Sequence, residues 1–161
     1  MSVVALLATA VLVAATPAAP TAPSEADRAA ITQTALDYIE SWYEGNAERM
    51  ERALHPDLAK RIVRTQPEGR GRVEHMGALS LVQGVRTGYG KKTPTDKQQK
   101  DITLLDVYGN TASVKIVAAD WVDYLHLGKV NGRWVIVNVL WEMKPEAMAA
   151  HAAEAPKPGK K

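Results

Sequence analysis

The hydrophobic and polar positions that follow Ser24 have the spacing of an amphipathic helix. Ser24 can cap such a helix, with Asp27 three residues further on, and neither proline nor glycine interrupts the chain before Gly45. At about 100° per residue, five positions fall on one face of this helix. They are Ile31, Ala35, Tyr38, Ile39 and Trp42. The pattern predicts a first helix that lays an aromatic stripe against the core.

Shorter helices are predicted after this one. Gly45 ends the first helix, and a second is expected over Ala47 to about Leu54. Pro56 disfavours helical geometry for the residue before it, which interrupts the chain at that point. We expect a third short helix from Asp57 onward, whose apolar residues are Leu58, Ile62 and Val63.

The middle of the chain is mostly polar. Gln66 to Glu74 contains two glycines and predicts a loop. His75 to Val85 is a candidate helix, although two glycines weaken it. Arg86 to Lys100 is rich in glycine and lysine and predicts a long exposed loop.

The carboxy-terminal third has the composition of a β-sheet. Three runs are rich in Val, Ile, Leu and aromatic residues: Ile102 to Val107, Ala112 to about Leu127, and Trp134 to Trp141. The first two runs are separated by a turn at Gly109. Asn131-Gly132 separates the last two and is a strong hairpin signal, because this pair accepts the positive φ of a type I′ turn. Helices followed by an antiparallel meander predict an α+β fold with the helices on one face of the sheet.

The alternation along the middle strand predicts which side chains face the core. Its first half places four apolar residues inward: Ala112, Val114, Ile116 and Ala118. Continued without a break, the alternation also turns Asp120, Val122, Tyr124 and His126 inward. A bulge near Trp121 would instead turn Trp121, Asp123 and Leu125 inward. The sequence leaves both alternatives open.

The last strand is apolar on both of its faces. One face carries Trp134, Ile136, Asn138 and Leu140, and the other carries Val135, Val137, Val139 and Trp141. An apolar outer face needs a cover, which a second copy of the chain supplies most economically. We therefore expect a homodimer that forms through the outer face of the sheet.

Composition changes the picture mainly at the two ends of the 161 residues. Residues 1–23 carry no charged side chain, and their apolar run is too short to span a membrane. This pattern predicts a signal peptide with a linker, and hence a secreted or periplasmic protein. Residues 24–145 form the predicted domain, and the Ala/Lys-rich tail, 146–161, is expected to be disordered or a frayed helix at most.

Charge and cysteine content exclude several kinds of partner and chemistry. Lys and Arg number 20 against 18 Asp and Glu, so no charge excess favours nucleic acid. The absence of cysteine excludes disulfides, thiolate metal sites and a cysteine nucleophile. The spacing of His55, His75 and His126 matches no metal-ligand motif, and no cofactor motif is present.

The candidate catalytic residues are Asp120, Tyr124 and His126. A carboxylate held among apolar neighbours can act as a general base, while a tyrosine or protonated histidine can donate to a developing oxyanion. A ligand-lining role and a purely structural role for this cluster both stay open.

The candidate ligand-binding residues lie on three predicted elements. Tyr38 and Trp42 sit one turn apart on the first helix and could stack on a flat molecule. Asn138 is a polar residue between apolar ones and needs a hydrogen-bond partner if it is buried. The remaining candidates are Trp121, Asp123 and His55.

Several sequence blocks together resemble the putative lumazine-binding family of the nuclear transport factor 2-like (SnoaL-like) superfamily. They are Tyr38 to Gly45, Met50 to Leu58, Asp120 to Leu127, and Gly132 to Trp141. The resemblance extends over about Ala26 to Met143. It implies a cone, in which a curved antiparallel sheet wraps around a long N-terminal helix, with a ligand cavity and usually a homodimer. It implies no particular reaction, because such folds host catalysts, receptors and scaffolds.

Three functions follow from these expectations. The first is an exported protein that binds a small, planar or cyclic hydrophobic molecule in the cone. The second is an acid–base isomerase, dehydratase or cyclase that uses the Asp, His and Tyr cluster. The third is a non-catalytic dimeric interaction module whose cavity is filled by its own side chains.

Overall fold

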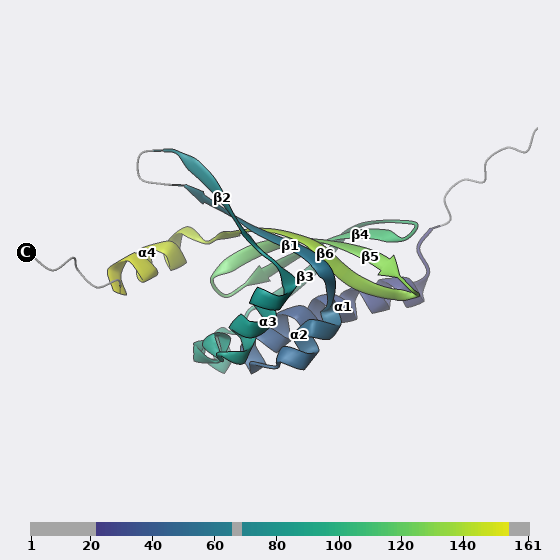
Figure 1. The fold of residues 1–161 in the computed structure, drawn as a ribbon, viewed down its shortest axis with the longest axis horizontal. Coiled ribbons are helices and arrows are strands. Elements are labelled where there is room, and N and C mark those ends of the chain that lie inside the picture. Colours follow the sequence, from purple (N-terminus) through teal and green to yellow (C-terminus); the bar gives the residue numbers. More distant parts are fainter. Residues whose placement is uncertain (1–21, 66–68, 155–161) are drawn as a thin grey trace, which may run out of the picture.

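Four helices and six strands make up the computed structural model of the chain (Figure 1). It describes residues 22–65 and 69–154. The helices are α1 (Glu25–Glu44), α2 (Ala47–Ala53), α3 (Ala78–Arg86) and α4 (Pro145–Glu154). The strands are β1 (Leu54–Thr65), β2 (Gly71–Met76), β3 (Lys100–Tyr108), β4 (Thr111–Ala118), β5 (Trp121–Val130) and β6 (Arg133–Met143). Two short 3-10 helices, η1 (Tyr89–Lys92) and η2 (Thr95–Lys97), lie between α3 and β3.

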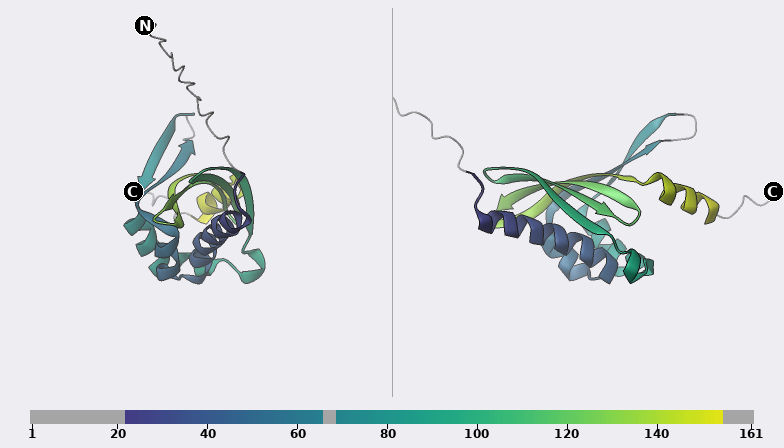
Figure 2. Two further views of the ribbon diagram at one scale, coloured as in Figure 1. Left: turned by 90° about the vertical axis from the view of Figure 1, so that its right-hand side faces the viewer. Right: turned by 180° about the vertical axis from the view of Figure 1, so that it is seen from behind.

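The strands form one curved sheet that wraps around α1. Its order is β2-β1-β6-β5-β4-β3, and all neighbours are antiparallel except β1 and β6, which run parallel. Seen along its length, the sheet curls over α1 (Figure 2, left), and α2 and α3 lie on the same side as α1 (Figure 1). The predicted α+β cone is therefore confirmed. Its concave face, closed by the helices, holds the hydrophobic core.

The first helix has the ends that its sequence predicts. Ser24 caps it by accepting a hydrogen bond from the Asp27 amide at 3.1 Å, and Gly45 ends it at a φ of 66°. Four of the five predicted stripe residues are buried, and Trp42 is partly buried. The hairpin turn is also as predicted, because Asn131 and Gly132 both have positive φ.

The predicted third helix is wrong, because residues 54–65 form strand β1. Leu58, Lys60 and Ile62 are buried at alternate positions, which is strand periodicity. Lys60 interrupts the apolar alternation by which a strand is recognised. Because Leu58 and Ile62 are four residues apart, their spacing also fits one turn of a helix. The predicted polar loop at 66–74 is likewise replaced from Gly71 onward by β2, which pairs with β1.

The predicted middle strand is in fact two strands, β4 and β5, joined at Ala119 and Asp120. Tyr43 of α1 holds this turn, since its hydroxyl accepts from the Ala119 amide at 3.0 Å and donates to the Gln99 carbonyl at 2.8 Å. The turn resets the alternation, so Trp121, Asp123 and Leu125 face the core and Tyr124 faces outward.

A register shift divides the predicted faces of β6. Asn138 pairs with His126, but Ile136 pairs with Leu127, so one extra residue bulges between them. Ile136 and Val139 are consequently both buried, and Leu140 lies exposed on the outer face. The expectation that Asn138 and Leu140 share a face with Ile136 is therefore wrong.

The alanine-rich stretch after β6 forms a helix. Helix α4 covers most of the stretch predicted to be disordered or a frayed helix, and it projects beyond the end of β6 (Figure 1). The predicted signal peptide, apart from residues 22 and 23, and the last residues of the tail lie outside the described part of the chain. Among the residues described, we find no helix with the length and apolar character that crossing a membrane requires.

Candidate functional site

A lysine and an aspartate form an ion pair inside the cone. Lys60 on β1 and Asp123 on β5 lie 2.8 Å apart, with side-chain exposures of 7% and 0%. The intervening strand β6 fixes their separation, because Lys60 pairs with Val139 and Asp123 pairs with Trp141. Lysine and aspartate are almost never this deeply buried unless they are paired. The pair therefore marks the polar centre of an otherwise apolar interior.

Three aromatic side chains contact this ion pair. The Lys60 ammonium donates to the Tyr38 hydroxyl at 2.6 Å, and the Trp121 indole donates to the second Asp123 oxygen at 2.6 Å. The ammonium also lies 4.6 Å from the centre of the Trp141 ring. An ammonium has three N–H donors, and the described residues give it two acceptors.

Burial shifts the protonation equilibria of two of these groups. Loss of hydration lowers the pKa of Lys60 below its usual range, although the negative charge of Asp123 opposes the shift. Burial, reinforced by the charge of Asp123, raises the pKa of Tyr38 well above that of a free tyrosine. The phenol therefore stays protonated and can donate its O–H, while the amine is easier to deprotonate than a surface lysine.

A cavity of about 250 Å³ opens beside Lys60, and we call it the Lys60 cavity. Its lining is almost entirely apolar and aromatic, with Lys60 and Arg64 as its charged members. The lining residues are Tyr38, Trp42, Met50, Lys60, Arg64, Met76, Leu81, Trp121 and Trp141. A concave, apolar site with a few convergent polar groups is the usual form of a small-molecule site.

The loop before β3 fixes one wall of this cavity. Gly90 packs so closely on α1 that a Cβ at this position would lie 2.2 Å from the Trp42 carbonyl oxygen and 2.6 Å from its ring. Trp42 in turn packs edge-on against Trp121, with ring centres 5.8 Å apart. Only glycine allows the loop to approach α1 this closely. The contact holds the Trp42 ring in its position in the cavity wall.

The structure brings four of the predicted ligand-binding residues together. Tyr38, Trp42 and Trp121 line the Lys60 cavity, and Asp123 stands behind Lys60. His55 does not join them: it lies at the start of β1, where its ring accepts a hydrogen bond from the Asp57 amide. Its neighbours form a separate hollow between α2 and α3.

The other predicted residues lie outside the cone. Asn138 and His126 face outward and contact each other at 3.2 Å, and Arg61 donates to the Asn138 oxygen at 3.0 Å. Asp120 lies in the turn before β5, and Tyr124 is 46% exposed on the outer face. The expected inward cluster of Asp120, Tyr124 and His126 therefore does not form, because the turn at Asp120 reverses the alternation.

Lys60 is the functional candidate that the sequence analysis missed. A lysine is normally a surface residue, so the segment containing it is most simply interpreted as a helix with an exposed polar face. The signal that could have revealed it is the alternation of Leu58, Lys60 and Ile62, in which a single cation occupies an inward position of a strand.

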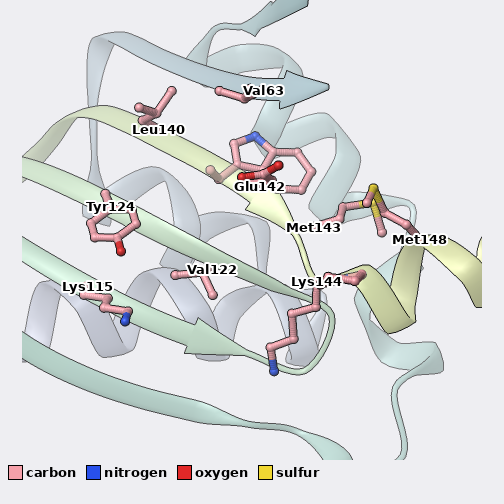
Figure 3. Close-up of a pocket in the computed structure, with 11 residues that line it drawn as sticks. Val63, Lys115, Val122, Tyr124, Leu140, Glu142, Met143, Lys144 and Met148 are labelled. Atoms are coloured by element: carbon pink, nitrogen blue, oxygen red, sulfur yellow. The ribbon is translucent and has the colours of Figure 1, made fainter. Parts of the chain in front are cut away.

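The structure also contains hollows larger than the Lys60 cavity. One, of about 440 Å³, is on the outer face of the sheet between Tyr124, Leu140 and Met148 (Figure 3). Another, of about 410 Å³, lies between α4 and the loop before β3, where it shares Trp42 and Trp121 with the Lys60 cavity. Neither contains a buried ion pair. Within residues 22–65 and 69–154, no three His, Cys, Asp or Glu side chains gather as a metal ion would require.

Comparisons with known proteins agree with this fold. The sequence profile described as putative lumazine-binding matches residues 26–142. A nuclear transport factor 2-like protein of unknown function from Shewanella baltica has a similar structure, with a TM-score of 0.60 and 15% identity over 78% of this chain and 99% of that one. A second, from Methylobacillus flagellatus, has a TM-score of 0.56 and 21% identity over 76% and 95% of the two chains.

A third solved structure is also similar, and its fold is called cystatin-like. A protein of unknown function with a cystatin-like fold from Nostoc punctiforme has a TM-score of 0.52 and 17% identity, over 76% of this chain and 94% of that one. At these identities the likeness concerns the fold alone. Comparison with curated proteins gives no match.

Proposed function

The chain belongs to the putative lumazine-binding family, and from this premise we propose that it binds a small, planar or cyclic, largely hydrophobic molecule in the Lys60 cavity. The observation that carries the proposal is a buried cation at the wall of an aromatic cavity. The family's description points to lumazines, which are flat two-ring heterocycles with ring carbonyl groups.

The lining of the cavity supports a flat ligand with a hydrogen-bond acceptor. Trp42, Trp121 and Trp141 offer aromatic surfaces against which a ring can pack. Lys60 has one N–H beyond those that Tyr38 and Asp123 occupy, and a ring carbonyl or ring nitrogen can accept it. The volume of about 250 Å³ favours a molecule of one or two rings over a larger one.

Binding is tested with lumazine as the probe. Three of the four tryptophans line the cavity, so a bound heterocycle should quench the intrinsic fluorescence saturably. Replacing the ion pair by apolar residues, in Lys60→Met/Asp123→Leu, removes the charged donor and should weaken binding by about ten-fold or more. Lys115→Met on the outer face is the matched control and should bind as the unaltered protein does.

Native mass spectrometry of protein purified from its own host provides a second, unbiased measurement. A small molecule that is retained by the unaltered chain and lost from the double variant supports the proposal. If quenching by lumazine does not saturate and no compound is retained, the proposal is wrong. That result would favour a non-catalytic interaction module that binds no ligand.

An acid–base enzyme is the second candidate function, and one observation favours it. The pKa of Lys60 is lowered and that of Tyr38 is raised, chiefly by burial, so a poised base and a protonated donor lie 2.6 Å apart. Lys60, Asp123 and Tyr38 would then take the roles first expected of Asp120, Tyr124 and His126. Conversion of a bound cyclic ketone, and its loss in Tyr38→Phe, would distinguish catalysis from binding alone.

We also propose that two copies of the chain pair through the outer face of the sheet. Tyr124 and Leu140 expose 46% and 44% of their surface there, beside Val122 and Val63 (Figure 3). Leu140→Asp should convert a dimer to a monomer in size-exclusion chromatography with light scattering. Leu79→Asp, on the exposed side of α3, is the matched control, and a monomeric unaltered protein would contradict the proposal.

Export is a proposal that rests on the sequence of residues 1–23. Expression of the full chain in a Gram-negative host should place a shortened protein in the periplasmic fraction. A full-length protein that stays in the cytoplasmic fraction would contradict it.

A further inference from the structure

The Lys60 side chain combines three features that a surface lysine lacks. It lies at the wall of a cavity, its ammonium is enclosed by aromatic rings, and its hydrogen-bond partners are a carboxylate and a phenol. A lysine amine is a nucleophile only when it is neutral, and burial in apolar surroundings is the usual means of making it so. We propose that Lys60 forms an imine with small aldehydes or ketones that enter the Lys60 cavity.

The surroundings of Lys60 make its neutral form more accessible than that of a surface lysine. Loss of hydration lowers its pKa, and this effect outweighs the attraction of Asp123. Lys115, by contrast, lies on the outer face, where its ammonium is 5.9 Å from the centre of the exposed Tyr124 ring. The two lysines therefore offer a comparison of a buried and a partly exposed amine within one protein.

The partners of Lys60 can move the protons that imine formation requires. Asp123 lies 2.8 Å from the amine and can take the proton that leaves the ammonium. The Tyr38 oxygen lies 2.6 Å from the same nitrogen, and burial keeps its O–H protonated. A carbonyl oxygen bound beside Lys60 can thus accept a hydrogen bond from Tyr38, and the phenol can pass it a proton while taking the one that the attacking nitrogen loses.

The reaction balances without any oxidant or reductant. The amine lone pair forms the C–N bond, the carbonyl π electrons move to oxygen, and that oxygen gains the proton that the nitrogen loses, which gives a carbinolamine. The C–O bond then breaks, the oxygen leaves as water with the proton that Asp123 took from the ammonium, and the nitrogen lone pair completes the C=N bond. One carbonyl compound and one ammonium give one protonated imine, paired with the Asp123 carboxylate, and one water.

The walls of the cavity define the chemical class of the carbonyl compound. Trp42, Trp121 and Trp141 favour an aromatic or cyclic group, and the volume of about 250 Å³ limits its size. This inference rests on the proposed function, because it needs the cavity to admit a small molecule, but it adds a covalent bond that lumazine binding does not require.

Benzaldehyde with cyanoborohydride tests the proposal, because the reductant converts an imine into a stable secondary amine. We expect the intact mass to rise by one benzyl group, and peptide mapping to place that group on Lys60 about ten-fold faster than on Lys115. Tyr38→Phe should slow the labelling of Lys60, and Lys115→Met should leave it unchanged. Lys60→Arg should abolish the fast labelling and leave the slow labelling of the other lysines, with a cooperative unfolding transition as the check that this variant folds.

Competition on the unaltered protein makes the test independent of any variant. Saturating lumazine should protect Lys60 from labelling and leave the exposed lysines reactive. If benzaldehyde quenches the tryptophans saturably but Lys60 is not labelled faster than Lys115, the imine proposal is wrong and the binding proposal stands. If benzaldehyde and lumazine both fail to quench and Lys60 is not labelled, both proposals are wrong.

Discussion

Lys60 and Arg49 are both cations held by carboxylates, but one lies inside the cone and the other at its surface. Lys60 faces the single carboxylate of Asp123, and both are almost fully buried. Arg49 on α2 has a side chain that is 17% exposed, and it contacts three carboxylates of α1. These carboxylates belong to Asp37, Glu40 and Glu44.

The difference shows that the number of ion-pair partners does not determine how much stability is lost when a charged side chain is removed. Arg49 has more ion pairs, and its hydrogen bonds to the three acids raise its pKa even though partial burial opposes this. Water and salt can nonetheless replace much of what each acid provides there. Asp123 is the only carboxylate paired with the Lys60 ammonium among the described residues, and both side chains are almost fully buried, so loss of either partner leaves a buried charge unpaired.

The largest effect is expected from Lys60→Met. This substitution leaves the Asp123 carboxylate buried without its cation, and the free energy of unfolding should fall by about 3–5 kcal/mol, as measured by urea denaturation. The double variant Lys60→Met/Asp123→Leu removes both charges and should be clearly more stable than the single one. If the double variant is less stable than Lys60→Met, the unpaired buried charge of Asp123 does not explain why loss of Lys60 costs more stability than loss of Arg49.

A smaller effect is expected from Arg49→Gln. Because Glu44 is half exposed and solvent screens the cluster, the free energy of unfolding should fall by only about 1 kcal/mol. Raising the NaCl concentration to about 1 M should shrink this loss, whereas the Lys60→Met loss should persist. Equal salt dependence of the two variants in urea denaturation would contradict the comparison.

The smallest effect is expected from the ion pair at the start of α1. Hydrogen bonds from Lys129, Trp134 and Ser24 lower the pKa of Asp27 to about 2. A carboxylate whose pKa is depressed on folding stabilises the protein above its ordinary pKa of 3.8, and this contribution is lost as the pH falls toward 2. Asp27→Asn should therefore flatten the decline of the melting temperature between these two pH values.

A control at a nearby exposed acid makes this measurement specific. Glu25→Gln lies in the same helix turn and should leave the acid limb unchanged. If both variants flatten it equally, the helix dipole rather than the Lys129 contact accounts for the effect.

The sequence predicts the parts of this fold whose signals are local. The Ser24 cap, the Gly45 stop and the Asn131-Gly132 turn each depend on a few adjacent residues, and the structure confirms them. The turn at Ala119 and Asp120 has no glycine or proline, and it is held by Tyr43, which lies far away in the chain. Such a turn leaves no local signal.

The candidate site was hidden for a related reason. Lys60 and Asp123 occupy inward positions on strands, so each interrupts the apolar alternation by which a strand is recognised. Tyr38 and Trp42 were found because their helix pattern is intact. Polar residues that serve a buried site thus weaken the pattern that would reveal them, and only the three-dimensional pairing of β1, β6 and β5 brings them together.

The parallel pairing of β1 with β6 has a consequence for the order of folding. Strands β3 to β6 follow one another as hairpins and can assemble through contacts close in sequence, but β1 joins the sheet only when β6 is in place. Lys60 and Asp123 are 63 positions apart, so closing their contact spans a long loop, and we expect it to be a slow, late step of folding. We therefore expect the Lys60 ammonium to lose its hydration mainly when β1 docks against β6.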